Sequence, residues 1–534
     1  MLIDLRSASE LPVIDADVCI VGAGAAGLHM ARRLTEKGVT VCLAESGGLD
    51  FEQATQDLYR GANLGMPYYE LDESRLRFFG GTVAIWGGRC AVLDPIDFEH
   101  RHWVPESGWP ISRADLDPYY RQANAIFDVG EFNYENNVWE TLGQLDPGFD
   151  PAELDVKLWR FDEVMERFTA GRAKDLFDAP NLTVLLHANV SNLAANSGAN
   201  AIEEVEACSL NGNRVTVRAR QYVLACGAIE NSRVLLASND VESNGIGNRH
   251  DNVGRYFMEH PAGRVAKIDT PEPYALWALF QKIFPRSGPP LAPALRLGDE
   301  AQRRFEVLNN IVTFKLQRDP KHGVNMSSAV YNKLRHNISP DRKGRMADHL
   351  YRSLRTIFHR TARNSLEKFR ARTGRTHLYA ITRGEQAPNA ESRVVLSEER
   401  DALGSPRADL IWKLSEIDKK TARVFADVLD SELRRLGKGS AIPSDWLSEP
   451  GAQWPIDHTV GNHPFANYHQ LGGTRMGSDP AKSVVDADCR VHGYSNLYVT
   501  GGSVFPTSGW ANPTLTIVAL ALRTADHLAG LTRS

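Results

Sequence analysis

The chain has 534 residues, of which 42% are hydrophobic and 24% charged, and its formal net charge is −5. This length exceeds one ordinary hydrophobic core, so we expect two or more structural units. The acidic balance argues against a nucleic-acid partner, which favours a basic domain. No apolar stretch is long enough to predict a membrane span. The first residues lack a basic and apolar leader, so we expect a cytoplasmic protein.

The six cysteines are scattered along the chain and have no paired spacing. They predict neither a disulfide framework nor a metal site.

The first recognisable element is an apolar strand that runs into a glycine-rich turn and a helix, DVCIVGAGAAGLHMARRL. Gly22, Gly24 and Gly27 have the G-x-G-x-x-G spacing, which permits a tight turn and a close backbone approach to a pyrophosphate. Ala25 and Ala26 keep that approach narrow. The pyrophosphate would bind at the helix N-terminus, where free N–H groups favour negative charge.

A second apolar strand ends at Glu45 and Ser46, with Glu45 standing 23 residues after Gly22. At this distance a carboxylate can accept hydrogen bonds from a ribose hydroxyl. The order of strand, turn, helix, strand and acid predicts an adenine dinucleotide, either FAD or NAD. A purely structural glycine turn is the alternative.

The next segment, FFGGTVAIWGGRC, is loop-rich, and its glycines bracket a short apolar run. We expect the backbone to pass close to the bound group here, although a glycine-rich turn in a β-meander is an alternative. The candidate contacts are Gly80, Gly81, Thr82, Trp86, Gly87 and Gly88.

Residues 180 to 236 return to strand patterns and end in VLACGAIENSRVLLAS, which predicts a second crossover unit of the same sheet. Its candidate cofactor contacts are Val190, Cys226, Gly227 and Asn231. Alternating segments between residues 262 and 455 predict an antiparallel, substrate-facing sheet. The chain then continues through loops to a buried strand, NLYVTGG, and a long apolar helix.

The segment from residue 333 to 375 has thirteen Lys or Arg residues against three Asp or Glu residues. Its apolar residues recur at helical spacing, which predicts a basic helical insertion packed on the body of the protein. A docking surface for an acidic partner, an electron-acceptor protein or a membrane face is the alternative.

The C-terminal stretch from NYHQLGGTRMG to SGWANPTLTIVALALRTADHL closely resembles the signature of the glucose–methanol–choline (GMC) flavoprotein oxidoreductases. GGTVAIWGG, VLACGAIENSRVLLAS, NVGRYFMEHP and the N-terminal glycine motif extend the resemblance. Within the family, VTGGSVFPTSGWANPTLT is most similar to the sugar- and polyol-oxidising branch, which includes the pyranose oxidases and glycoside oxidase-like enzymes.

The resemblance implies an α/β fold, with a Rossmann-like FAD-binding domain on a parallel sheet and a substrate domain with an antiparallel sheet and helices. We expect residues 1–110, 180–262 and 456–534 to form the discontinuous FAD-binding domain. Residues 111–179 and 263–455 would form the substrate-binding domain, with the basic insertion near 333–375.

The catalytic pair that the resemblance implies is His469 and Asn512. An imidazole, whose ordinary pKa lies near neutrality, suits the removal of a hydroxyl proton. The Asn512 amide would fix the substrate oxygen. Without the resemblance, His469 would be a structural histidine and Asn512 a helix N-cap.

The C-terminal helix is expected to begin at Asn512 and Pro513, because proline suits the first helical position. Its free N–H groups would face the flavin pyrimidine ring and favour the charge left by hydride transfer. Further candidate cofactor contacts are Gly501, Gly502 and Thr514.

Several family members attach FAD covalently through a histidine in the loop that corresponds to TVAIW. Ile85 precedes Trp86 here, and no histidine occurs between Phe79 and Arg89, so we predict non-covalent FAD.

The resulting prediction is FAD-dependent oxidation of an alcohol group of a sugar, glycoside or sugar-like metabolite. Oxygen, a quinone or a partner protein would accept the electrons, and an oligomer is possible. The alternatives are a non-sugar alcohol such as a sterol or a secondary metabolite, a non-redox flavin lyase, an NAD-dependent dehydrogenase, and a binding module organised by the basic segment.

Overall fold

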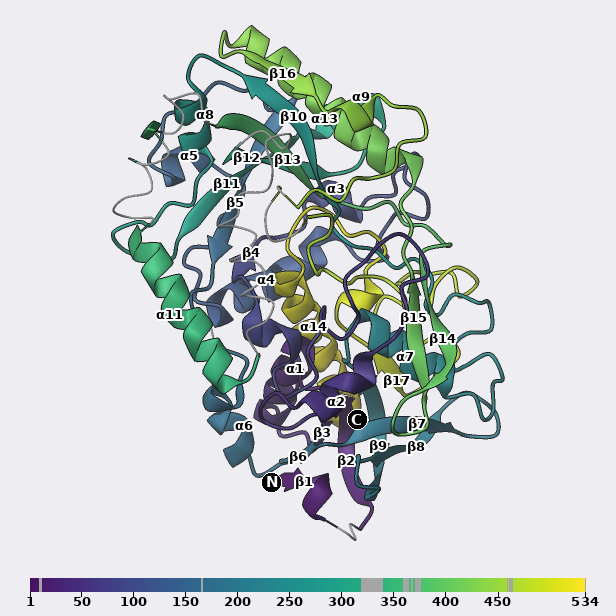
Figure 1. The fold of residues 1–534 in the computed structure, drawn as a ribbon. Coiled ribbons are helices and arrows are strands. Elements are labelled where there is room, and N and C mark those ends of the chain that lie inside the picture. The colour runs from purple at the N-terminus through teal and green to yellow at the C-terminus, as the bar shows by residue number, and fades with distance from the viewer. Residues whose placement is uncertain are drawn as a thin grey trace.

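The computed structural model describes residues 1–8, 12–164, 167–317, 340–358, 365, 368–369, 376–458, 460 and 464–533. Two large sheets lie at opposite ends of the molecule, with several helices between them (Figure 1). One sheet is mainly parallel and the other is antiparallel, so the predicted α/β fold with two kinds of sheet is confirmed.

The mainly parallel sheet has the strand order β1-β6-β3-β2-β9-β8-β7, and β17 also pairs with β9. Its strands are β1 (Leu2–Asp4), β2 (Ile14–Val21), β3 (Val41–Ala44), β6 (Leu182–Leu186), β7 (Asn189–Ala195), β8 (Ile202–Cys208), β9 (Arg214–Leu224) and β17 (Leu497–Val499). Two pairings in this sheet are antiparallel, β7 with β8 and β8 with β9, and the others are parallel. The central strand β2 ends in a continuous buried run because helices cover both faces of such a sheet.

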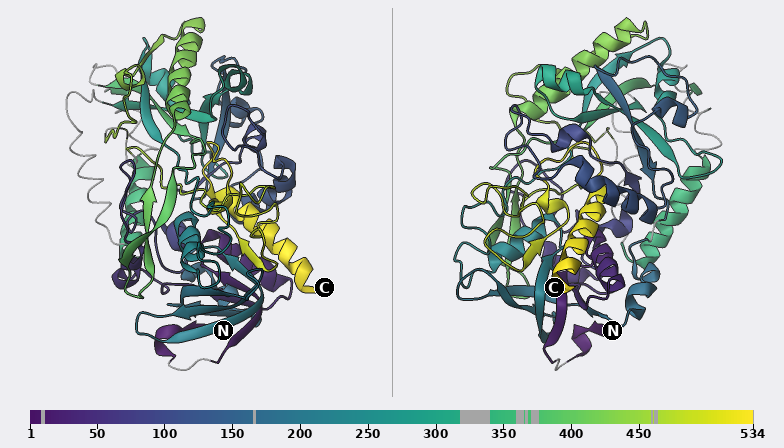
Figure 2. Two further views of the ribbon diagram at one scale, coloured as in Figure 1. Left: turned by 90° about the vertical axis from the view of Figure 1, so that its right-hand side faces the viewer. Right: turned by 180° about the vertical axis from the view of Figure 1, so that it is seen from behind.

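Two helices that are far apart in the sequence pack together over this sheet (Figure 2). They are α1 (Ala25–Glu36) and α14 (Thr514–Arg533). The first three turns of α14 are buried on nearly all sides, which explains why the sequence TLTIVALAL lacks a polar stripe.

The antiparallel sheet has the strand order β16-β10-β13-β12-β11-β5-β4. Its strands are β4 (Arg89–Cys90), β5 (Leu154–Phe161), β10 (Ala262–Asp269), β11 (Leu291–Leu297), β12 (Asn310–Gln317), β13 (His377–Gly384) and β16 (Ser440–Pro443). The long helix α13 (Glu416–Arg435) packs against β10 and β16. A separate hairpin, β14 (Arg393–Arg400) and β15 (Pro406–Ile411), contacts α7 (Ala228–Ala237).

Further helices complete the connections. They are α2 (Gln53–Gln56), α3 (Pro95–Phe98), α4 (Arg113–Ile126), α5 (Val138–Thr141), α6 (Lys174–Asp178), α8 (Pro273–Leu279) and α9 (Asp299–Phe305). Within the described ranges, no helix is both long enough and apolar enough to cross a membrane. The domain boundaries given above stay a proposal.

The predicted basic insertion is described only in part, chiefly as α11 (Arg342–Phe358), which lies along one side of the molecule (Figure 1). Arg345 attaches the helix to the body through an ion pair of 2.7 Å with Asp50. Met346, Leu350 and Leu354 are exposed, at 62%, 63% and 58% of their surface. The rest of residues 333–375, apart from 340, 341, 365, 368 and 369, lies outside the described residues, and the docking alternative stays a prediction.

Candidate active site

The predicted glycine motif follows β2 and leads into α1, as expected. Gly22 has a φ of +104°, and a Cβ atom there would lie 2.7 Å from the carbonyl oxygen of Ala225. A Cβ on Gly27 would lie 1.9 Å from the carbonyl oxygen of Gly22. Gly24 differs, because a Cβ there would meet nothing within 4 Å. The first and third glycines therefore allow close packing, whereas Gly24 borders open space at the N-terminus of α1.

Glu45 is buried directly after β3 and lies beside the glycine turn. Its carboxylate accepts hydrogen bonds from the backbone N–H of Ala23 at 2.9 Å and of Gly47 at 2.8 Å. The Ser46 hydroxyl also donates to this carboxylate, at 3.2 Å. These contacts hold a negative charge where α1 presents its free N–H groups.

The loop after residue 79 reaches the same place. The backbone N–H of Gly80 donates to the carbonyl of Ala23 at 2.9 Å, and a Cβ on Gly81 would lie 3.5 Å from the Cα of Gly24. Thr82 accepts a hydrogen bond from the Leu76 backbone, which fixes the loop internally. The structure therefore joins the first two predicted cofactor segments.

Trp86 anchors the far end of this loop in an aromatic cluster. Its ring lies 5.3 Å from that of Phe127 and 5.8 Å from that of Phe168, between centroids. Gly88 has a φ of +70°, and a Cβ there would lie 2.0 Å from the Asp162 carbonyl oxygen, whereas Gly87 borders open space. Packing therefore sets the path of this loop on both sides of Trp86.

Asn231 joins the second crossover to the C-terminal glycine loop. Its Oδ1 accepts from the Cys226 backbone at 2.8 Å, and its Nδ2 donates to the Ser503 hydroxyl at 2.9 Å. Cys226 also contacts the end of β2 through a hydrogen bond from Sγ to the Val21 carbonyl. Val190 is buried in β7 within the core that the parallel sheet shares.

These loops leave room for an extended ligand. A Cβ on any of four glycines would meet nothing within 4 Å: Gly24, Gly87, Gly227 and Gly501. Gly502 is packed more tightly, because a Cβ there would lie 2.8 Å from the Leu471 side chain. Open space beside Gly24, a helix N-terminus and a buried acid fit a dinucleotide.

The two predicted catalytic side chains lie together, although 43 residues separate them in the sequence. Nδ2 of Asn512 is 3.1 Å from Nε2 of His469, and both residues are half-buried. Trp159, on β5 of the antiparallel sheet, donates from Nε1 to Oδ1 of Asn512 at 3.1 Å. The pair therefore lies where the two sheets approach one another.

The second nitrogen of His469 contacts a residue that the sequence analysis did not select. Nδ1 of His469 lies 2.9 Å from Nδ1 of His260, which is buried just before β10. Nε2 of His260 lies 3.4 Å from the carbonyl oxygen of Ser508. Burial lowers the pKa of His260 to about 4, so its imidazole is neutral at neutral pH.

A buried carboxylate, Glu259, supports this arrangement. It accepts hydrogen bonds from the Tyr68 hydroxyl at 2.6 Å, from the His260 backbone at 2.9 Å and from the Asn467 backbone at 3.2 Å. Burial raises its pKa to about 7, and the Tyr68 and backbone hydrogen bonds oppose that rise. The sequence signal was the polar pair within the apolar stretch FMEHPAGRVA, which was used only as part of the family signature.

The helix that follows Asn512 begins one residue later than expected. The backbone N–H of Ile517 donates to the carbonyl of Pro513 at 2.8 Å, and α14 starts at Thr514. Pro513 is therefore the residue before the first helical position rather than the first helical residue, because its carbonyl begins the helical hydrogen-bond pattern. Thr514 opens the helix, whose first N–H groups lie next to Asn512.

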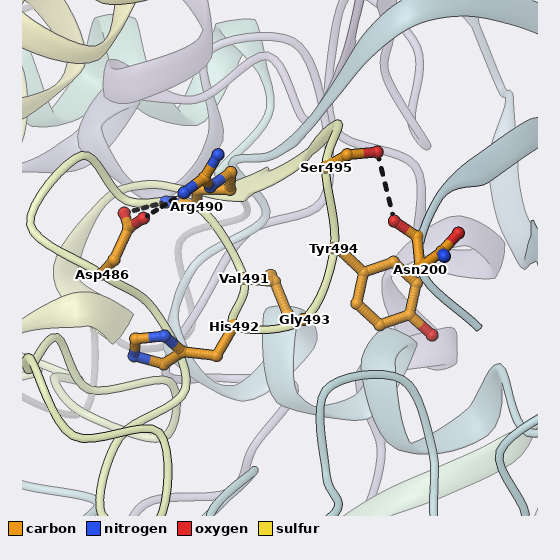
Figure 3. A pocket seen from close by; sticks show the side chains of 8 residues that line it. All are labelled: Asn200, Asp486, Arg490, Val491, His492, Gly493, Tyr494 and Ser495. Carbon is orange, nitrogen blue, oxygen red and sulfur yellow. Dashed lines mark hydrogen bonds and ion pairs between the residues drawn. The ribbon is translucent and has the colours of Figure 1, made fainter. Parts of the chain in front are cut away.

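A surface hollow of about 410 Å³ lies elsewhere, between the loop of residues 486–495 and Asn200 (Figure 3). Asp486 pairs with Arg490 at 3.2 Å, and His492 contacts the Ser483 hydroxyl at 3.0 Å. None of the predicted site residues lines it. Its charged groups are already paired, so we assign no function to it. In the described ranges, no cluster of three His, Cys, Asp or Glu side chains is arranged to bind a metal ion.

Comparison with known families identifies two regions of the chain. Residues 388–521 match the family model described as GMC oxidoreductase, and residues 17–241 match the one described as FAD dependent oxidoreductase. These ranges contain the glycine motif, the second crossover and the His469–Asn512 pair.

Individual relatives match almost the whole chain. The fructose dehydrogenase large subunit of Gluconobacter japonicus is 29% identical, over 96% of this chain and 98% of its own length. The 6'''-hydroxyparomomycin C oxidase of Streptomyces lividus is 26% identical, over 96% and 92%. The crystal structure of pyridoxine 4-oxidase from Mesorbium loti has the same fold, with a TM-score of 0.51 and 16% identity over 96% of this chain and 99% of that chain. The protein is therefore a GMC-type, FAD-dependent oxidoreductase.

Proposed function

We propose that the protein oxidises an alcohol group of a sugar, glycoside or sugar-like metabolite to a carbonyl group. The observation that carries this proposal is the convergence of Nε2 of His469 and Nδ2 of Asn512 at 3.1 Å. The names of the relatives, a fructose dehydrogenase and an aminoglycoside oxidase, support a sugar-like substrate.

In this proposal His469 is the base and Asn512 positions the substrate. The alcohol hydroxyl would face both side chains and replace their direct contact, giving its proton to Nε2 of His469 while its oxygen accepts a hydrogen bond from Nδ2 of Asn512. Bound FAD supplies the two-electron acceptor for the hydride that leaves the carbinol carbon. The N–H groups at the start of α14 favour negative charge beside Asn512.

We propose that FAD binds non-covalently in the space bordered by Gly24, Gly87, Gly227 and Gly501. Glu45 would accept hydrogen bonds from the ribose, and the first turn of α1 would face the pyrophosphate. Oxygen, a quinone or a protein remains the proposed electron acceptor.

The test is anaerobic mixing of the FAD-loaded protein with sugars, glycosides, polyols and plain alcohols while flavin absorbance is followed. Bleaching by sugar-like compounds supports the proposal, and bleaching only by plain alcohols contradicts the substrate class. His469→Ala should abolish bleaching while the flavin stays bound. Loss of FAD from this variant would instead give His469 a structural role. Peroxide detection in air then distinguishes oxygen from the other acceptors.

A further inference from the structure

The hydrogen bonds around His469 form one chain with a fixed direction. It runs from Trp159 through Asn512, His469 and His260 to the carbonyl of Ser508, over distances of 3.1, 3.1, 2.9 and 3.4 Å. Each of its ends admits only one assignment of donor and acceptor, and the two assignments can be made independently.

At one end, the indole Nε1–H of Trp159 can only donate, so the atom of Asn512 that faces it is the carbonyl oxygen. This determines the orientation of the amide. The Nδ2 group of Asn512 therefore faces His469. Since an amide NH₂ group only donates, Nε2 of His469 has a lone pair and its proton is on Nδ1.

At the other end, the Ser508 carbonyl can only accept, so Nε2 of His260 carries a proton. The low pKa of His260 keeps this imidazole neutral, which leaves a lone pair on its Nδ1. That lone pair faces Nδ1 of His469 at 2.9 Å and requires a proton there. Both ends therefore give the same tautomer of His469.

We propose that His260 is a positioning residue that holds His469 in the Nδ1–H tautomer, and that Trp159 holds the Asn512 amide in the matching orientation. This proposal rests on the proposed function. It gives each residue of the hydrogen-bond chain a role in presenting the Nε2 lone pair to the substrate hydroxyl. After the hydroxyl proton moves to Nε2, the resulting imidazolium keeps its Nδ1–H bond to the neutral His260. The hydrogen bond at one ring nitrogen determines which nitrogen is the base.

Two substitutions of His260 separate this role from packing. In His260→Leu the acceptor opposite Nδ1 of His469 is lost, whereas in His260→Asn the side-chain oxygen can replace it. We expect the rate of flavin reduction by substrate to fall at least about tenfold in His260→Leu, because a wrong tautomer removes the base. His260→Asn should stay within about threefold of the parent, and KM should change little in both.

A second readout does not depend on turnover. The FAD-loaded protein is labelled with ¹⁵N-histidine, and the His469 signals are assigned by comparison with His469→Asn. We expect a protonated Nδ1 and an unprotonated Nε2 in the parent protein and in His260→Asn. His260→Leu should show a mixture with the other tautomer, and so should Trp159→Phe, in which the Asn512 amide is free to rotate.

A parent spectrum with the proton of His469 on Nε2 overturns the proposal whatever the variants do. Unchanged His469 signals in both His260→Leu and Trp159→Phe also overturn it. If His260→Leu fails to bind FAD, the spectra of Trp159→Phe and of the parent protein still test the proposal. If no alcohol reduces the flavin, the proposed function fails, while the spectra still test the tautomer.

Discussion

Glu259 binds the backbone N–H of Asn467 at 3.2 Å and so holds the segment that carries His469 beside the segment that carries His260. It also binds the backbone of His260 itself. A single carboxylate thus connects two stretches of chain that are about 200 residues apart, and its protonation affects both.

This contact predicts a specific dependence of stability on pH. The pKa of Glu259 is about 7 in the folded protein, above its ordinary value of 4.5. Between these values the folded state keeps a proton that the unfolded state has released, so the contribution of Glu259 to stability is greatest below 4.5 and is lost as the pH rises to 7. Glu259→Gln removes the titrating carboxyl group and with it this dependence of stability on pH.

We therefore expect the difference in Tm between Glu259→Gln and the parent to become more favourable to the variant as the pH rises from 4.5 to 7. Thermal unfolding in buffers across this window measures it. Glu398→Gln, at an exposed carboxylate, is the control and should give a constant difference. A constant difference for Glu259→Gln as well would contradict the prediction.

Asn512→Ala should slow flavin reduction by about 100-fold, because it removes a donor positioned at the reacting oxygen. It should leave FAD bound, since the glycines that border the proposed FAD space are unchanged. Anaerobic stopped-flow absorbance gives the rate, with Asn239→Ala at an exposed asparagine as the control. A rate within twofold of the parent would remove Asn512 from the proposed chemistry.

The glycines of the first motif should separate into two groups. Gly27→Ala should destabilise the protein by about 2–3 kcal/mol through overpacking, because its Cβ would lie 1.9 Å from the Gly22 carbonyl oxygen. Gly24→Ala should cost less than about 1 kcal/mol, the effect of alanine at a helix N-cap. It should nevertheless weaken FAD binding, because its methyl group occupies the open space.

Thermal unfolding of the flavin-free protein and fluorescence titration with FAD test this pair. Equal losses of stability in the two variants, or unchanged FAD affinity in Gly24→Ala, would contradict the assignment of Gly27 to close packing and of Gly24 to FAD binding.

Acid precipitation should release all the flavin and leave a colourless protein, because residues 79–89 contain no histidine to form a covalent bond. Absorbance of the supernatant and the intact mass of the protein measure this. Flavin retained in the pellet would show an attachment through another residue.

Local patterns were sufficient to predict the strand, glycine turn, helix and strand at the start of the chain. The glycine spacing, the strands on either side and Glu45 are close in sequence, and the structure forms a single sheet and turn from them. Five of the seven strands of the antiparallel sheet lie in the predicted range of residues 262 to 455, whereas β4 and β5 join the sheet from earlier in the chain and were not predicted.

The partners of His469 and Asn512 could not be found in this way. His260 and Trp159 are 209 and 353 residues from the side chains they contact, and no spacing in the sequence marks them. Their roles depend on hydrogen-bond direction, which requires the positions of both partners. The start of α14 differed by one residue because proline suits several positions at a helix N-terminus.

The short strand β17 pairs with β9, and α14, which follows it, begins next to Asn512. During synthesis, all the described strands of both sheets are therefore made before Asn512. Seven strands of the mainly parallel sheet are complete at Leu224, whereas the antiparallel sheet is completed only by β16, and Tyr222–Leu224 of β9 wait for β17. With the proposed roles of His469 and Asn512, a chain that terminates before α14 would be inactive however well its sheets had formed.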